Sequence, residues 1–397
     1  MLSLKRNGAP FLWNGCAVLA EYAVNGRKIR VRPKETVSEI DKNGYFRRQP
    51  NHFTTPFGDG ENDLKAEGNK RYRLVWAKLC HWSNRAAIVR ELEGLEDQIS
   101  VNMVEHAPHE KNLGWEYVCN ENNIDPMLGD QFLSEAYYRA DDDYQGRTTV
   151  PALIDTTTGK VVNNDYNWLT TYFEVNFRPW HKKGAPELYP VELREEIDKM
   201  NLWLFDNINN AVYRSSFSRS NEGHFDGVNT FYAAMDRLEK RLETNRFLFG
   251  DYVTDSDIRL YVTLARLDIR YTAQLGETKR PLYTYKNLWG YAKELWEIPA
   301  FAHHTDFAAI IRQGRIAGEE DGFRASTHYD LALPKIVLDA QWKVSTERAY
   351  LSSDPTHPIY LGNNRRFDID PTWYDLGAES PKKEEKETPP SCGCFCG

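Results

Sequence analysis

Cys80-His81-Trp82-Ser83 is the segment whose residue types point most directly to chemistry. It stands between a short apolar run and a segment with helical spacing, so Cys80 is expected at a helix N-terminus. Unpaired backbone N–H groups and the helix dipole favour a thiolate there, and the thiolate is the nucleophilic form. Ser83 replaces the second cysteine of a C-x-x-C motif, so the site has one thiol, to which the Ser83 hydroxyl is expected to donate. The alternative is an inert buried cysteine.

Two further motifs are typical of a site for a peptide-like thiol. Pro151 begins a predicted strand, and a cis bond after Val150 would present the Val150 backbone to such a ligand; an ordinary strand-edge proline is the alternative. Residues 163–166, Asn-Asn-Asp-Tyr, open a predicted helix. Backbone N–H groups there bind carboxylates, and Asp165 could hold an ammonium group, whereas a plain helix cap is the alternative.

The elements that must position these motifs form two predicted domains. A strand over 71–77, a helix after Cys80 and a strand over 99–106 make a strand–helix–strand unit. A helix, two strands and a last helix follow, giving a small α/β sandwich over 71–177. Residues 178–190 contain three prolines and are predicted to be a linker. Residues 191–312 are almost entirely helical in pattern, including a capping box from Thr254 to Asp257.

The two ends of the chain lack such periodicity. Residues 1–70 predict an irregular extension that packs on the body. Residues 313–378 have no clear structure, and the charged, proline-rich segment 379–397 is predicted to be disordered. Its cysteines, Cys392, Cys394 and Cys396, are one ligand short of a closed zinc site, so no metal is expected. Truncation after Gly377 should therefore change neither activity nor melting temperature.

Composition excludes several classes of function. The net charge of −8 argues against nucleic-acid binding, which needs a basic surface. No apolar run approaches the roughly 20 residues of a membrane span, and the N-terminus does not read as a signal peptide. The six cysteines are scattered or crowded at the end of the chain rather than spaced as a disulfide framework. A protein of the reducing cytoplasm is expected.

From about Phe46 to Arg312 the chain resembles the xi class of glutathione transferases, the glutathionyl-hydroquinone reductases. The matching positions are the Cys80 motif with Arg85 and Glu93-Gly94-Leu95-Glu96, Gly114-Trp115, Tyr144 to Pro151, Val161 to Tyr166, Ile208 to Tyr213, Asp257 to Asp268, and Asn287 to Tyr291. The resemblance implies a thioredoxin-like N-terminal domain followed by a transferase-type helical bundle. It also implies a homodimer that uses glutathione.

The resemblance further implies roles for individual residues. Cys80 would be the nucleophile, with His81 and Trp82 beside the substrate. The bound thiol would lie along Trp115, Val150, Pro151, Asp165 and Tyr166. An acceptor pocket of three tyrosines in the family is matched by Tyr213, Tyr271 and Trp296. This chain departs from the family by having His81 for proline, Ser83 for alanine and Asp165-Tyr166 for Glu-Ser, so another low-molecular-weight thiol could replace glutathione.

Three functions follow from these residues. The first is reductive deglutathionylation of an aromatic thioether conjugate, a small molecule, through a Cys80 mixed disulfide. The second is an omega-type thiol transferase or dehydroascorbate reductase that uses the same cysteine. The third is a non-catalytic binding module. Comparing activity on menadione conjugates with activity on hydroxyethyl disulfide separates the first two functions. The pH dependence of Cys80 alkylation tests the third.

Overall fold

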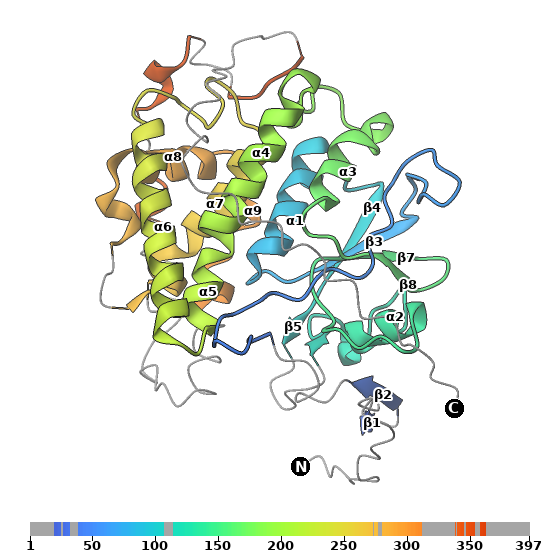
Figure 1. The fold of residues 1–397 in the computed structure, drawn as a ribbon. Helices are drawn as coiled ribbons and strands as arrows, with labels where there is room; N and C mark the ends of the chain where they lie inside the picture. The colour runs from blue at the N-terminus through green and yellow to red at the C-terminus, as the bar shows by residue number, and fades with distance from the viewer. Residues whose placement is uncertain are drawn as a thin grey trace, which may run out of the picture.

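The computed structural model describes residues 20–24, 27–31, 39–106, 114–272, 274–276, 280–311, 338, 340–344, 347–353 and 358–362. An α/β layer and a bundle of helices lie side by side, as Figure 1 shows. This confirms the predicted architecture, a thioredoxin-like domain followed by a helical bundle. Within the ranges described, no helix is long and apolar enough to cross a membrane.

A four-stranded sheet in the order β4-β3-β7-β8 forms the core of the first domain. Strand β3 (Tyr72–Trp76) pairs in parallel with β4 (Ile99–Met103) and antiparallel with β7 (Ala152–Asp155), which pairs with β8 (Lys160–Asn163). Side chains of a strand alternate between the faces of a sheet. Leu74 therefore packs with helices α1 (His81–Glu93) and α3 (Leu169–Val175), while Val75 packs with α2 (Leu133–Ala140).

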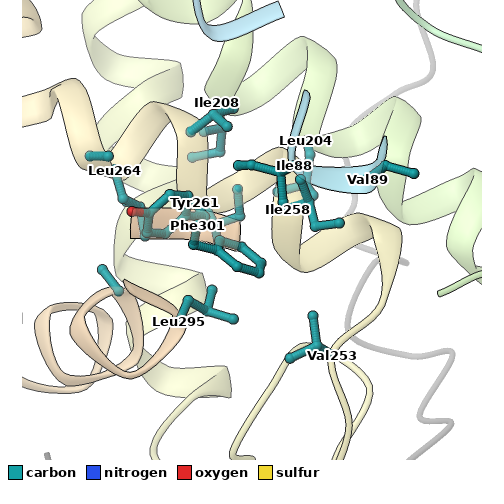
Figure 2. Packing of buried hydrophobic residues seen from close by; sticks show 14 of the residues in the cluster. Ile88, Val89, Leu204, Ile208, Val253, Ile258, Tyr261, Leu264, Leu295 and Phe301 are labelled. Carbon is teal, nitrogen blue, oxygen red and sulfur yellow. The ribbon is translucent and has the colours of Figure 1, made fainter. Parts of the chain in front are cut away.

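The second domain is a helical bundle built around α7 (Asp255–Arg266), whose residues are all buried. Thr254 and Asp257 form the predicted capping box at its start. Ile88 and Val89 of α1 pack with Leu204, Ile258 and Tyr261 in one continuous core across the two domains (Figure 2). The other helices are α4 (Arg194–Leu204), α5 (Ala211–Phe217), α6 (Asn221–Arg241), α8 (Lys286–Trp296) and α9 (Pro299–His303).

Short elements connect these helices and strands. Two π-helical turns matter for the site, Phe205–Asn209 before α5 and Leu267–Tyr271 after α7. Strands β5 (Glu105–His106) and β6 (Trp115–Glu116) form a small separate pair. The 3-10 turns are Glu121–Asn123, Arg178–Trp180, Val191–Leu193, Leu282–Thr284 and Ala349–Leu351.

The structure differs from the sequence prediction in several places. The predicted strand over 99–106 is divided, because β4 ends at Met103 and Glu105–His106 pair with β6 in a separate sheet. The N-terminal extension contains a hairpin, β1 (Ala20–Val24) and β2 (Arg27–Val31), where no regular structure was expected. Helix α3 begins at Leu169 rather than near Asp165, because residues 165–168 form a turn. Helix α6 begins ten residues before its apolar spacing becomes clear, because Ser220 caps it and Gly227 lets it approach the backbone of α5.

Parts of the C-terminal extension are described and pack on the helical domain. Trp342 lies against Tyr261, Trp289 and Phe307, with ring centroids 6.2, 5.1 and 5.4 Å away. Arg348 donates to the carbonyls of Leu242 and Asn245. The terminal segment 379–397 and its cysteines lie outside the described residues, and so does Cys16.

A buried carboxyl group marks the contact between α3 and α7. Glu174 is 2% exposed and forms no ion pair with the described residues. Nearby, Asp255 is paired with Arg259 at 2.6 Å, and Arg259 also donates to Thr170 of α3. Burial raises the pKa of Glu174 well above its usual 4.5, and the charge of Asp255 raises it further. The carboxyl group of Glu174 therefore stays protonated where an exposed glutamate is ionised.

We expect Glu174→Gln to stabilise the protein increasingly as pH rises. The folded-state pKa lies above that of the unfolded chain, so the folded state binds more protons above about pH 4.5, and stability falls as pH rises through that window. Glutamine does not titrate, so the variant does not lose this stability as pH rises. Melting temperatures should rise by a few degrees at about pH 8 and barely change near pH 4. The exposed Glu195→Gln is the control, and a pH-independent effect of Glu174→Gln would contradict the assignment.

Candidate active site

Cys80 lies where the sequence predicts, as the N-cap of α1 with extended backbone angles, φ −85° and ψ 118°. It is 9% exposed, and its Sγ lies 3.7 Å from the carbonyl oxygen of Val150, to which the thiol donates. The Val150–Pro151 bond is cis. The expected hydrogen bond from Ser83 is absent, because the Ser83 hydroxyl is buried with no partner among the described residues. Among the described residues, the backbone carbonyl of Val150 is therefore the hydrogen-bond partner of the thiol.

His81 is buried rather than open to substrate, at 1% exposure. Its Nδ1 lies 2.8 Å from the hydroxyl oxygen of Tyr271, and its ring packs edge-on against Trp82 and Tyr213 at 4.1 and 5.3 Å. Burial lowers the pKa of His81 well below 6.5, and the charge of Arg266 lowers it further. His81 is therefore a neutral hydrogen-bond partner of a tyrosine and does not titrate near physiological pH.

Tyr213 and Tyr271 come together from different helices beside Cys80, with ring centroids 6.4 Å apart. Tyr213 stands in α5 just after one π turn, and Tyr271 ends the other π turn. Burial raises the pKa of both phenols above 10, and for Tyr213 the charge of Cys80 adds to the effect. Both phenols therefore keep their protons and can donate them.

Trp82 and Tyr166 make an aromatic wall, with ring centroids 4.6 Å apart. Arg48, which the sequence analysis missed, places its guanidinium over this wall, 4.9 Å from the Trp82 centroid and 4.4 Å from that of Tyr213. Arg85 lies 4.9 Å from the Trp82 centroid and donates to the carbonyl of Tyr166. Burial lowers the pKa of Arg85 to about 9, which still leaves it charged near neutrality. Two guanidinium groups therefore flank Trp82.

Asp165 is part of a turn rather than a helix cap. Its Oδ1 accepts from the Asn51 amide at 2.9 Å and from the backbone N–H of Asn167 at 3.0 Å. The side chain is largely buried, and no described residue donates to its Oδ2. One carboxylate oxygen thus holds the local structure, and the other is available to a ligand.

The two remaining predicted residues lie in different surroundings. Trp115, in β6, packs against the cluster that contains Cys80, and its ring centroid is 5.1 Å from that of His106. Trp296 ends α8 and packs on the larger core. In the part of the chain that the structure describes, its buried indole N–H has no hydrogen-bond partner. Trp296 therefore stays a predicted residue of the acceptor side.

Arg266 is a second residue whose role the sequence analysis missed. It is 2% exposed at the end of α7, and it donates to the carbonyls of Lys78 and Leu79 at 3.1 Å each. It also donates to the Asn84 side chain. The turn before Cys80 is therefore fixed by a cation from the other domain. The run from Asp257 to Asp268 contained this arginine, but only the fold reveals its partners.

The comparisons with known proteins agree with this geometry. Residues 213–294 match the family model for the glutathione S-transferase C-terminal domain. The chain is 35% identical over 281 residues to glutathione S-transferase omega-like 2 of Schizosaccharomyces pombe, covering 68% of this chain and 88% of that protein. It resembles the solved xi glutathione transferase of Phanerochaete chrysosporium with a TM-score of 0.62 and 33% identity, covering 68% of this chain and 88% of that one.

Glutathionyl-hydroquinone reductase YqjG of Escherichia coli is a further relative. It is 34% identical over 242 residues, which cover 60% of this chain and 73% of YqjG. Its glutathione-bound structure matches with a TM-score of 0.61 and 30% identity, covering 73% of this chain and 96% of that one. The chain belongs to the xi class of glutathione transferases. In this xi-class protein, the residues of the described ranges include no cluster of histidine, cysteine and carboxylate side chains that could hold a metal ion.

Proposed function

We propose that this xi-class transferase removes glutathione reductively from aromatic thioether conjugates such as glutathionyl-hydroquinones. The observation that carries the proposal is the position of one thiol between two kinds of partner. The Cys80 thiol donates to the Val150 carbonyl, which a peptide-like thiol could also use, and the two protonated phenols lie 6.4 Å apart where the charge of Cys80 acts on both. The names of its relatives, among them two glutathionyl-hydroquinone reductases, support the same chemistry.

The reaction balances with the groups present and glutathione as reductant. The Cys80 thiolate attacks the conjugate sulfur, an S–S bond forms and the aryl C–S bond breaks. The electron pair leaves with the ring carbon, which takes a proton from Tyr213 or Tyr271. A second glutathione thiolate attacks the mixed disulfide and releases oxidised glutathione and the Cys80 thiolate. The sulfurs are oxidised, the ring carbon is reduced, and no second protein cysteine is required.

His81 fits this step as a positioning residue. If its neutral ring carries the proton on Nδ1, it donates to the Tyr271 oxygen at 2.8 Å and leaves the phenolic proton free for the ring carbon. We propose that tautomer. A histidine in place of the family's proline would then hold the acid in place beside the thiol.

The test is a comparison of substrates with the full-length protein and glutathione. Turnover of a glutathionyl-menadione conjugate with release of the reduced quinone supports the proposal, and mass spectrometry should find glutathione on Cys80. Turnover of hydroxyethyl disulfide or dehydroascorbate, without turnover of the conjugate, would contradict the proposed reaction and support the omega-type function that one relative's name suggests. Loss of both activities, with normal folding, would leave a binding module. Parallel incubations with other thiol disulfides show which thiol loads Cys80.

We also propose that the protein acts in the cytoplasm as a homodimer, since reducing conditions suit a free thiol nucleophile and closed two-fold dimers are the commonest oligomers. Light scattering at micromolar concentration should give twice the mass of the chain. A monomeric mass would contradict the dimer.

Asp165→Asn should raise the Michaelis constant for the thiol about 10–100-fold, with a smaller change in turnover. Asparagine keeps the Oδ1 acceptor that Asn51 and Asn167 use, so the turn should survive. The change replaces Oδ2 by an amide that cannot pair with an ammonium group. Steady-state kinetics at saturating conjugate measures the effect. Asp141→Asn, an exposed carboxylate paired with His52, is the control. An unchanged Michaelis constant for glutathione would show that Asp165 only shapes the turn.

A further inference from the structure

The segment 44–57, called here the N-terminal arm, joins the two domains across the site (Figure 1). On the helical side, the carbonyl of Gly44 accepts from Arg219 and the N–H of Phe46 donates to Ser218. On the thiol side, Asn51 donates to Asp165, and Phe53 exchanges hydrogen bonds with Asn164. Arg48 lies midway along the arm, so the arm carries its guanidinium over the gap between Trp82 and Tyr213.

The surroundings of Arg48 hold the cation but do not neutralise it. Its Nε donates to the Asn210 side chain at 2.9 Å, and its Nη2 is buried with no hydrogen-bond partner in the described part of the chain. The remaining contacts are ring faces, those of Phe46, Trp82, Tyr166 and Tyr213, at 4.4 to 5.9 Å. Cation–π contacts orient a guanidinium but leave its in-plane N–H groups unsatisfied.

Two further cations lie near Arg48. Arg85 lies on Trp82 and Arg266 lies behind the Cys80 turn, and within the described residues neither forms a salt bridge with a carboxylate. Asp165, the carboxylate on the thiol side, already accepts from Asn51 and Asn167. The cluster of aromatic side chains beside Cys80 thus has an excess of positive charge, and one N–H donor of Arg48 has no partner among the described residues. Both features are suited to an anion with a flat apolar body.

We propose that Arg48 binds an anionic substituent on the aromatic ring of the conjugate, so that the preferred substrates are conjugates of aromatic acids. The inference rests on the proposed function of the same site. Arg48 is anchored by Asn210 of the helical domain and covers Tyr213, which places it on the acceptor side of Cys80 rather than along Val150. A ring bound on the Tyr213 side of Cys80 would bring a ring carboxylate within reach of Nη2 of Arg48, which has no hydrogen-bond partner among the described residues. Arg48 is then a specificity-determining residue.

The test compares two conjugates, glutathionyl-gentisate, whose hydroquinone ring carries a carboxylate, and neutral glutathionyl-menadiol. The wild-type kcat/KM should favour the carboxylated conjugate by about tenfold or more, the size of one charge-assisted hydrogen bond. Arg48→Met should bring that ratio close to one, and Arg48→Lys should retain part of it. Arg47→Met is the matched control, because Arg47 is an exposed neighbour paired with Asp41, and its ratio should equal that of wild type.

Binding measurements separate this inference from the proposed reaction. Calorimetric titration of the Cys80→Ser protein with each conjugate needs no turnover. The carboxylated conjugate should bind more tightly than the neutral one, and this difference should disappear in Cys80→Ser/Arg48→Met. The measurement tests Arg48 even if the wild-type protein turns over neither conjugate. Equal affinities for the two conjugates overturn the proposal. An increase of the Michaelis constant for glutathione in Arg48→Met, with an unchanged conjugate ratio, also overturns it and assigns Arg48 to the carboxylate of the thiol. Melting temperatures verify that each variant is folded.

Discussion

Cys80→Ser is expected to lower the rate of thiol transfer on the order of 10³-fold or more, because the catalytic cycle depends on a sulfur nucleophile that forms and breaks a disulfide. A serine hydroxyl is scarcely ionised at neutral pH and cannot form the mixed disulfide. The change should leave the fold intact. Serine fits the N-cap position and can donate to the Val150 carbonyl as the thiol does.

The measurement is glutathione-dependent turnover together with intact-protein mass spectrometry. Wild type incubated with the conjugate should carry one glutathione, and Cys80→Ser should carry none at that position. Cys119→Ser is the control, since Cys119 is an exposed free cysteine with no part in the proposed mechanism, and its rate should equal that of wild type. If Cys80→Ser turned over the conjugate at the wild-type rate with an unchanged melting temperature, the mechanism would be wrong.

Arg266→Met should have the largest effect on stability and a large effect on rate. Its removal leaves the Lys78 and Leu79 carbonyls and the Asn84 side chain without their buried donor. Each buried acceptor left unsatisfied costs about 1–3 kcal/mol, so we expect a loss of about 3 kcal/mol or more. The turn before Cys80 would also be released, and a displacement of about 1 Å at a reacting group can cost on the order of 10²-fold in rate.

Denaturant unfolding gives the stability, and the rate of Cys80 alkylation reports the position of the thiol independently of catalysis. Arg266→Lys should recover only part of the stability and only part of the alkylation behaviour, because an ammonium group cannot donate to all three acceptors that lie around the planar guanidinium. Arg280→Met is the control, since Arg280 lies on the same domain in an exposed pair with Asp236. If Arg266→Met lost no more unfolding free energy than Arg280→Met, the turn before Cys80 would not depend on Arg266.

Local sequence determined the elements that carry the chemistry. The β-like run of β3, the helical spacing after Cys80 and the capping box at Thr254 depend on residues a few positions apart, so each could be predicted from the chain alone. The placement of Cys80 at a helix start and of Val150-Pro151 at a strand start came from the same local signals. Their meeting at 3.7 Å required only that the predicted strands pair in one sheet.

The contacts that decide how the site works were set by tertiary packing. Tyr271 reaches His81 across 190 positions, Arg266 reaches Lys78 across 188, and Arg48 reaches Asn210 across 162. Nothing near these residues in sequence indicates their partners. The Ser83 hydroxyl was predicted to donate to the thiol, but it is buried with no hydrogen-bond partner among the described residues, because the direction of a side chain at a helix start depends on what packs over it. Sequence therefore specified the proposed nucleophile, and the packing of the helical bundle and the N-terminal arm set the hydrogen bonds and the charges that surround it.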